Sequence, residues 1–216
     1  MSGVEAVLLV HGLWLHGVAM KLMRLRLERC GYEVHAPSYA SMRCTLHENA
    51  EALARYSRGM RCTKLHLVGH SMGGLVALTA ARAVPAECRG RIVLIGTPFA
   101  DSFSGRVLQR SPAGRWLLGR CMTQWLNEPR PEVAQDFDVG VVAGNGGIGM
   151  GRIVARGLPK PNDGVVAVFE TRVPAMRDHI TLPVSHTQML VSREVVRQAR
   201  NFIEHACFDH TGLRPA

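Results

Sequence analysis

One serine in this sequence stands in a setting that could turn its hydroxyl into a nucleophile. Ser71 lies at the centre of residues 69–73, which read Gly-His-Ser-Met-Gly, a G-x-S-x-G pattern. The run 65–68 enters the pattern and the apolar run 75–81 leaves it, so we predict a buried strand, a sharp turn and a helix. Such a turn holds its serine in a strained conformation above a helix N-terminus, whose free N–H groups favour negative charge.

A serine hydroxyl needs a base to take its proton, and the base needs an acid to orient it. Where a serine sits on this kind of turn, the acid follows it in the chain and the histidine comes last. Asp163 follows a predicted strand and its loop, and His186 comes directly after the last predicted strand. We predict His186 as the base, with His179 in reserve, and Asp163 as the acid, with Asp178 and Asp138 behind it.

Each of these assignments has a plain structural alternative. The G-x-S-x-G pattern can be an ordinary tight turn, and Asp163 precedes Gly164 in a common turn pair. His186 can be a surface loop histidine. The order of all three along the chain is what favours chemistry over these readings.

Negative charge on a reacting oxygen needs two N–H donors. The residue after the nucleophile supplies one, which is Met72. The other is expected from the loop after the first strand, at Leu13, or at Trp14 if the loop winds differently. His11 and His70 are interpreted as structural neighbours of the two turns.

Apolar runs and helical periodicity alternate along the chain. This alternation predicts an α/β fold, a mainly parallel sheet of about six strands with helices on both faces. With no repeat or linker visible, we expect one domain over 1–216, with a small cap over about 100–135. Strands are predicted at 6–10, 32–37, 65–68, 91–96, 136–144 and 179–184, and helices at 16–30, 46–58, after residue 71 to before 85, 103–109, 113–126 and 188–207.

The composition is that of a globular protein, with 47% hydrophobic and 20% charged residues. No apolar run reaches the roughly 18 residues of a membrane span, and no leader is visible, so a cytoplasmic location is expected. The net charge of +9 is scattered, which indicates a solvated surface and no nucleic-acid partner; it permits contact with a membrane surface without indicating it. The six cysteines show no C-x-x-C pair, so we expect reduced thiols, no metal and no cofactor.

Four segments in this order resemble the α/β-hydrolase superfamily: 11–14 (His-Gly-Leu-Trp), 69–74 (Gly-His-Ser-Met-Gly-Gly), 96–98 (Gly-Thr-Pro) and 162–166 (Asn-Asp-Gly-Val-Val). Within it the chain is similar to bacterial serine lipases and to GPI inositol-deacylase-like esterases, over about residues 4 to 207. The resemblance implies hydrolysis of carboxylic esters, from small molecules or lipids, through an acyl-enzyme. It assigns Ser71 as nucleophile, His186 as base and Asp163 as orienting acid.

Two features depart from the lipases of this superfamily. Residues 187–190 contain no acid, where such lipases often hold calcium, so no calcium site is expected. The segment from about 100 to 135 is short for a lid, which favours short-to-medium acyl esters over long triglycerides. Four aromatic residues could line the acyl pocket, with core packing equally open for each: Trp14, Phe99, Trp116 and Trp125.

Other functions also fit parts of the sequence. Residues 144–149 match G-x-G-x-x-G after a strand, with Glu170 at about the spacing of a nucleotide-binding protein, although Pro159 and Pro161 interrupt any long helix there. A hydrolase fold used only for binding is a second alternative, against which the complete Ser, Asp and His set argues. A thioesterase, amidase or acyltransferase could use the same three residues.

Overall fold

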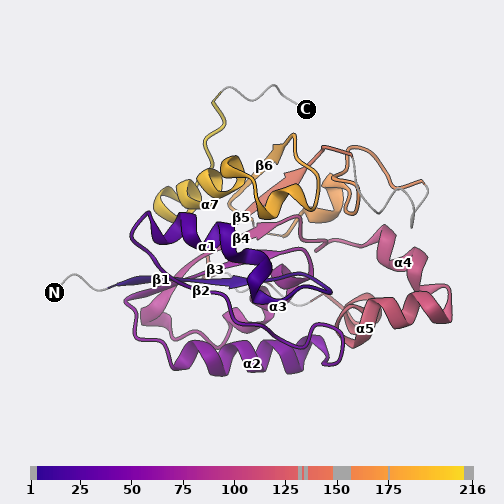
Figure 1. Ribbon diagram of the computed structural model, residues 1–216, viewed down its shortest axis with the longest axis horizontal. Coiled ribbons are helices and arrows are strands. Elements are labelled where there is room, and N and C mark those ends of the chain that lie inside the picture. The colour runs from indigo at the N-terminus through magenta and orange to yellow at the C-terminus, as the bar shows by residue number, and fades with distance from the viewer. Residues whose placement is uncertain (1–3, 131–132, 134–135, 148–156, 175, 212–216) are drawn as a thin grey trace.

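The computed structural model describes residues 4–130, 133, 136–147, 157–174 and 176–211. Its centre is a sheet of six strands, all parallel, in the order β2-β1-β3-β4-β5-β6 (Figure 1). The strands are β1 (Glu5–Val10), β2 (Glu33–His35), β3 (Lys64–His70), β4 (Arg89–Ile95), β5 (Val139–Gly144) and β6 (Asp178–Leu182). The predicted fold class is therefore confirmed.

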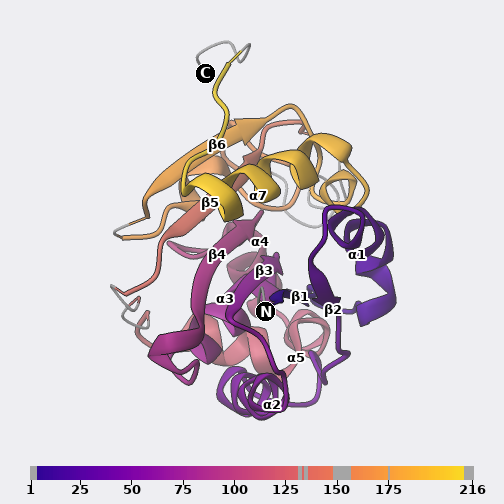
Figure 2. The same cartoon turned by 90° about the vertical axis from the view of Figure 1, so that its left-hand side faces the viewer.

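Helices cover both faces of this sheet. Figure 2 shows α1 (Lys21–Glu28) and α7 (Arg193–His205) on one face, and α2 (Leu46–Arg58), α3 (Met72–Ala81) and α5 (Pro112–Asn127) on the other. The short helix α4 (Phe103–Gln109) packs against α5. Among the described residues, no helix is long and apolar enough to cross a bilayer.

The sheet is buried on both sides because side chains alternate along each strand. In β1, Ala6, Leu8 and Val10 enter the core cluster on the α2–α3–α5 face, whereas Val7 and Leu9 enter the cluster beneath α1 and α7. All five are almost completely shielded from solvent. This explains why the strands read as continuous apolar runs in the sequence.

Local sequence rules hold at several element ends. The predicted helix 46–58 is α2, and its N-terminus carries the predicted capping box, in which Thr45 accepts the Glu48 amide and Glu48 accepts the Thr45 amide. The predicted helix 103–109 is α4.

Other boundaries differ from prediction for identifiable reasons. The strand expected from residue 136 starts at Val139, because Asp136 and Asp138 turn outward to pair with arginines. The helix expected over 188–207 is a 3-10 turn, Gln188–Leu190, followed by α7, whose N-terminus is set by the Ser192 hydroxyl accepting the amide of Val195. Helix 16–30 is likewise a 3-10 turn, Gly17–Met20, followed by α1.

Helix α5 is broken in the middle. Gly119 takes φ 63° and ψ −178°, which only glycine adopts without strain. The next amide, of Arg120, leaves the helix and donates to the carbonyl of Met42 at 2.9 Å. A Cβ at Gly119 would lie 2.7 Å from that same carbonyl oxygen. The break therefore joins α5 to the loop before α2.

Candidate active site

The candidate site lies where the chain changes direction across the sheet. From β1 the chain moves to β2 at one edge and then returns to β3 on the other side of β1. Loops at the carboxyl ends of two such neighbouring strands diverge and leave a crevice, which is where open parallel sheets bind ligands. Gly12 follows β1 and Ser71 follows β3, so the topology places these two residues at the crevice.

Ser71 occupies a strained turn between β3 and α3, as predicted. Its φ of 56° and ψ of −131° are unfavourable for a residue with a Cβ. Two backbone bonds hold it there: its amide donates to the carbonyl of Ile95 at 2.8 Å, and its carbonyl accepts the amide of Gly74 at 3.0 Å. A Cβ at Gly73 would lie 2.2 Å from the Val10 carbonyl oxygen, so the turn needs glycine for close packing.

His186 and Asp163 form a buried pair, although 23 residues separate them in the chain. His186 Nδ1 lies 2.7 Å from Asp163 Oδ2, and the His186 amide donates to the Asp163 carbonyl at 2.9 Å. The other carboxylate oxygen, Oδ1, accepts the amides of Val165 and Val166 at 2.9 and 2.7 Å. Since both carboxylate oxygens are engaged, the carboxylate is fixed in plane and orientation.

His70, the residue before Ser71, also contacts His186. Its Nε2 donates to the carbonyl of His186 at 3.0 Å, and the two rings lie 4.8 Å apart between centroids. Because a carbonyl can only accept, this bond fixes His70 as the Nε2–H tautomer. Complete burial lowers the pKa of His70 to about 3, with the neighbouring His186 adding to the effect. His70 therefore stays neutral beside the site.

The loop after β4 allows the histidine and aspartate to approach the sheet. Gly96 has φ 57°, and a Cβ there would lie 3.1 Å from His186 Nδ1 and 3.2 Å from Asp163 Oδ2. Any side chain at Gly96 would both strain the backbone and crowd the pair. This gives a physical reason for the glycine of the Gly96-Thr97-Pro98 segment.

The two residues predicted to donate N–H groups to a developing oxyanion line one cavity with Ser71. Met72 is the first residue of α3, so its amide belongs to the helix N-terminus, where no intrahelical acceptor is available. Leu13 lies in the loop after β1, in a turn closed by the Leu15 amide and the Gly12 carbonyl at 3.4 Å. Trp14, in the same turn, takes φ 62°, a strained value for a bulky residue.

The loop after β1 is fixed by Tyr39, a residue that the sequence did not point to. The Tyr39 hydroxyl donates to the His11 carbonyl at 2.5 Å, and the Tyr39 amide donates to His11 Nε2 at 3.2 Å. Nε2 is thus an acceptor, so Nδ1 carries the proton and donates to the Gly12 carbonyl at 2.9 Å. The two rings stack at 4.1 Å. Burial lowers the pKa of His11, which keeps this arrangement neutral.

Ser71 and His186 open onto one shared cavity of about 250 Å³. Its remaining surface is mostly apolar and comes from three regions: the loop after β1, the α4–α5 segment, and the loops carrying Val165 and His186. The lining comprises Gly12, Leu13, Trp14, Leu15, His70, Ser71, Met72, Pro98, Ser102, Ser104, Gly105, Leu108, Leu118, Met122, Val165, Val166, His186, Thr187 and Leu190. Both predicted N–H donors, Leu13 and Met72, are among them.

The four aromatic residues suggested for the acyl pocket take different positions in the structure. Trp14 lines the cavity, but Phe99 and Trp125 pack against each other in the core, 5.7 Å apart between ring centroids. Trp116 points to solvent and is not part of the lining. Helix periodicity before the break at Gly119 explains this, because Gly114 and Leu118 lie four residues apart on the buried face of α5, whereas Trp116 lies between them on the outer face.

The reserve candidates and the nucleotide-binding alternative lie apart from this cavity. Asp138 pairs with Arg177, and His179 contacts the Thr171 hydroxyl at 3.1 Å. Glu170 is buried and accepts the amides of Ala167 and Phe103, so it is not available to a ribose. A Cβ at Gly144 would lie 2.9 Å from Asp163 Cβ, so this glycine serves the packing of the candidate site. Residues 148–149, at the end of the G-x-G-x-x-G pattern, lie outside the described residues.

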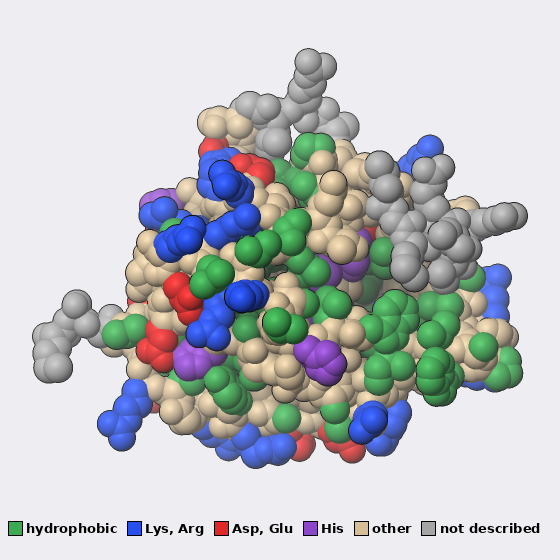
Figure 3. All heavy atoms as spheres, viewed as in Figure 1, with side chains coloured by type: hydrophobic (Ala, Val, Ile, Leu, Met, Phe, Trp, Pro, Cys, Tyr) green, Lys and Arg blue, Asp and Glu red, His purple; other side chains and the backbone are tan. Residues whose placement is uncertain are grey.

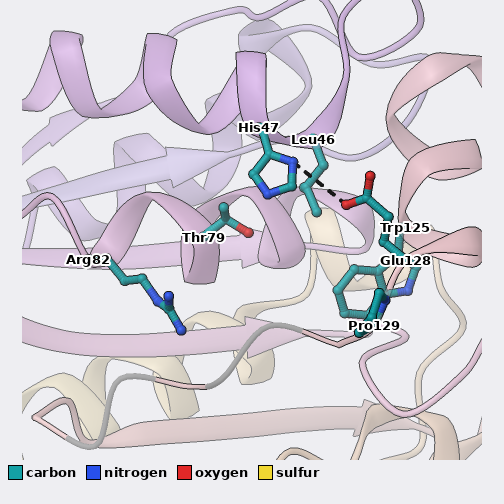
Figure 4. Close-up of a pocket in the computed structure, with 7 residues that line it drawn as sticks. All are labelled: Leu46, His47, Thr79, Arg82, Trp125, Glu128 and Pro129. Carbon is teal, nitrogen blue, oxygen red and sulfur yellow. Dashed lines mark ion pairs between the residues drawn. The ribbon is translucent and has the colours of Figure 1, made fainter.

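A second cavity of about 300 Å³ lies on the far side of α3. Figure 4 shows its walls: Thr79 and Arg82 at the end of α3 face Trp125 and Glu128 from the α5 region, and His47 pairs with Glu128 at 3.8 Å. It contains none of the three residues predicted to be catalytic. In the described part of the chain, no cluster of three or more His, Cys, Asp or Glu side chains could hold a metal ion.

Comparisons with known proteins agree with the observed fold. A search of curated protein sequences finds no significant match. Among solved structures, the mature lipase BlEst2 of Bacillus licheniformis aligns with a TM-score of 0.69 at 18% identity, covering 95% of this chain and 93% of that one. The pyrethroid hydrolase PytH aligns with a TM-score of 0.69 at 14% identity, covering 94% and 98%. The metagenomic carboxyl esterase MGS0156 aligns with a TM-score of 0.61 at 17% identity, covering 86% and 65%.

These structural likenesses concern the fold, since all three identities are low. The family assignment comes from the sequence itself, because the family model described as the alpha/beta hydrolase family matches residues 7–203. That range contains Ser71, Asp163, His186 and every residue lining their cavity. The resemblance seen in the sequence motifs is therefore confirmed, and the chain belongs to the alpha/beta hydrolase family.

Proposed function

We propose that this protein is a serine hydrolase that cleaves carboxylic esters with short-to-medium acyl groups through an acyl-enzyme. Ser71 is the nucleophile, His186 the general base and Asp163 the acid that orients it. One observation carries the proposal: the buried Asp163–His186 pair, at 2.7 Å, opens onto the same cavity as the strained Ser71. A binding-only scaffold has no need for this pairing.

In the first step, the Ser71 hydroxyl attacks the ester carbonyl and passes its proton to His186. Asp163 accepts a bond from His186 Nδ1–H, which leaves Nε2 as the free acceptor for that proton. The imidazolium that forms is stabilised by the Asp163 carboxylate. The proton then goes from Nε2 to the leaving alkoxide, so an alcohol departs and the acyl group stays on Ser71 Oγ.

Water completes the cycle by the same route. His186 takes a proton from a water molecule, the hydroxide attacks the acyl carbonyl, and the returned proton releases Ser71. In both steps the carbonyl oxygen becomes an oxyanion, which the amides of Met72 and Leu13 stabilise. The neutral His70 adds no competing charge there, because burial holds its pKa at about 3.

The cavity favours an acyl chain of limited length. Leu108, Leu118 and Met122 form an apolar wall contributed by the α4–α5 segment, which we interpret as a small cap over the site. A volume of about 250 Å³ lies just below the range usual for drug-sized ligands, roughly 300–1,000 Å³. The structural neighbours named as lipase, pyrethroid hydrolase and carboxyl esterase also support an ester substrate.

A panel of p-nitrophenyl esters of graded acyl length, run beside thioesters and amides, tests the proposal. We expect turnover of short-to-medium esters, a fall in kcat/KM for long chains, and no turnover in Ser71→Ala. Preference for thioesters would redirect the assignment to a thioesterase using the same residues. A panel without turnover at any length, from folded protein, would refute ester hydrolysis.

A further inference from the structure

Large apolar side chains are exposed beside the mouth of the cavity. Trp116 is 75% exposed, Trp14 50% and Leu117 37%. They belong to one surface, because the Trp14 indole N–H donates to the Leu117 carbonyl at 2.8 Å. Exposed tryptophans are costly in water, and a cluster of them marks a surface for contact with an apolar partner. We call Trp14, Arg115, Trp116 and Leu117 the rim.

The rim continues directly into the cavity. Trp14 lines the cavity and is also half exposed to solvent. Leu118, the next residue after Leu117, lies on the cavity wall. Figure 3 shows hydrophobic side chains gathered over the end of this face where α4 and α5 lie, with Lys and Arg side chains at the margin. A molecule leaving an apolar layer at Trp14 would therefore meet the apolar wall of the cavity directly.

Three of the segments that border the mouth carry basic side chains and no acidic ones. Residues 102–127, which include α4 and α5, contain Arg106, Arg110, Arg115 and Arg120 and no Asp or Glu. Residues 6–27 and 36–47 likewise contain Lys and Arg but no acid. Arg106 pairs with Asp101, and Arg120 lies 3.8 Å from Glu48. Arg115 instead donates to the Gln109 carbonyl, which leaves its charge uncompensated by that contact.

We propose that the rim docks on the surface of an anionic lipid bilayer, with Trp14, Trp116 and Leu117 in the interface and the arginines against the lipid headgroups. Tryptophan favours this zone because its ring is apolar and its N–H is polar. Basic residues add attraction to anionic lipid. A second copy of the chain fits this face less well, because a two-fold contact would bring arginine against arginine.

Vesicle co-sedimentation tests this docking without depending on catalysis. The protein carries Ser71→Ala, so lipid is not hydrolysed during the measurement and the result stays independent of the proposed ester hydrolysis. The probes are vesicles of phosphatidylcholine alone and of phosphatidylcholine mixed with phosphatidylglycerol. We expect binding to the mixed vesicles that weakens as salt is raised, and much weaker binding to phosphatidylcholine alone.

Matched variants locate the contact. In the Ser71→Ala background, Trp116→Ser is expected to lower the partition coefficient by about tenfold, and Arg115→Gln by about fivefold. The controls are Tyr56→Ser and Arg55→Gln on the last turns of α2, both exposed and far from α5 along that helix. Both controls are expected to bind as the parent does.

Three results would overturn the docking proposal. One is the absence of binding to either vesicle, and another is binding that Trp116→Ser and Arg115→Gln leave unchanged. The third is a concentration-dependent dimer in light scattering that Trp116→Ser abolishes, which would assign the rim to a second copy of the chain. Circular dichroism of each variant shows that a loss of binding is not a loss of fold.

Discussion

The two walls of the candidate site are built by different means. The sheet side, with Ser71, Asp163 and His186, is fixed by buried polar contacts whose partners come from separate loops. The α4–α5 side faces the cavity with apolar side chains and carries the exposed Trp116, and its backbone bonds, such as that of the Arg120 amide to the Met42 carbonyl, lie outside the cavity lining. Hydrogen bonds specify direction to a fraction of an ångström, whereas apolar contact tolerates change in shape. We therefore expect the proposed reaction geometry to depend on the first wall and substrate preference on the second.

The largest effect is expected from Asp163→Asn on the sheet side. An asparagine Oδ1 can keep the bonds from the Val165 and Val166 amides, which points its NH₂ group at His186 Nδ1. The histidine is then forced into the tautomer whose Nε2 already carries a proton. We expect kcat to fall by about 10⁴-fold with little change in thermal stability. A fall of less than tenfold in folded protein would show that Asp163 does not orient the base.

His70 links the same wall to the pH dependence of stability. Its folded pKa, about 3, is below its unfolded value near 6.5. The contribution of neutral His70 to the stability of the folded state is therefore complete above pH 6.5. It is lost as the pH falls towards 3, by up to about 1.4 kcal/mol per pH unit. Urea unfolding at a series of pH values is expected to show a flatter profile between pH 6.5 and 4 for His70→Asn. Equal slopes in both proteins would contradict this account of His70.

On the α4–α5 side, a change in the shape of the cavity wall should alter the preference for acyl length and leave the chemical step unchanged. Met122 is buried on the cavity wall, and Met122→Phe adds a rigid ring there. We expect kcat/KM to fall by about tenfold for the longest accepted ester and to change little for the acetate, which serves as the internal control. A uniform loss across the whole ester series would mean that Met122 supports the fold and does not limit acyl length.

The smallest effect is expected at Tyr39, which holds the loop after β1. Tyr39→Phe keeps the ring stacked on His11 but removes the bond to the His11 carbonyl. Loss of one such bond, about 1 kcal/mol, is expected to lower kcat about fivefold with KM unchanged, because the loop positions an oxyanion donor that acts mainly in the transition state. A rise in KM with constant kcat would place Tyr39 in substrate binding instead.

The sequence predicted the parts of this protein that depend on local rules. The strand-turn-helix around Ser71 could be read because its glycines and apolar runs are contiguous, and the capping box of α2 follows from the spacing of Thr45 and Glu48. The break in α5 is not predictable from local sequence, because it depends on the close approach of Gly119 to the carbonyl of Met42, which is distant in the chain. The same holds for Tyr39, whose contact with His11 spans 28 residues.

Side-chain direction was the other quantity that the sequence left open. Four aromatic residues were equally good candidates for the pocket, and the structure separates them by the face of the helix or loop on which each lies. Phe99 and Trp125 face the core, Trp116 faces solvent and Trp14 faces the cavity. A helix register that is uncertain by one residue turns a side chain by about 100°, so tertiary packing decides such assignments.

Fluorophosphonate labelling followed by peptide mass spectrometry tests the central claim most directly, since the reagent reacts only with an activated serine. We expect one equivalent of label on the peptide containing Ser71, and labelling slowed by orders of magnitude in folded His186→Ala. Label on a different serine, or an unchanged labelling rate in His186→Ala, would contradict it.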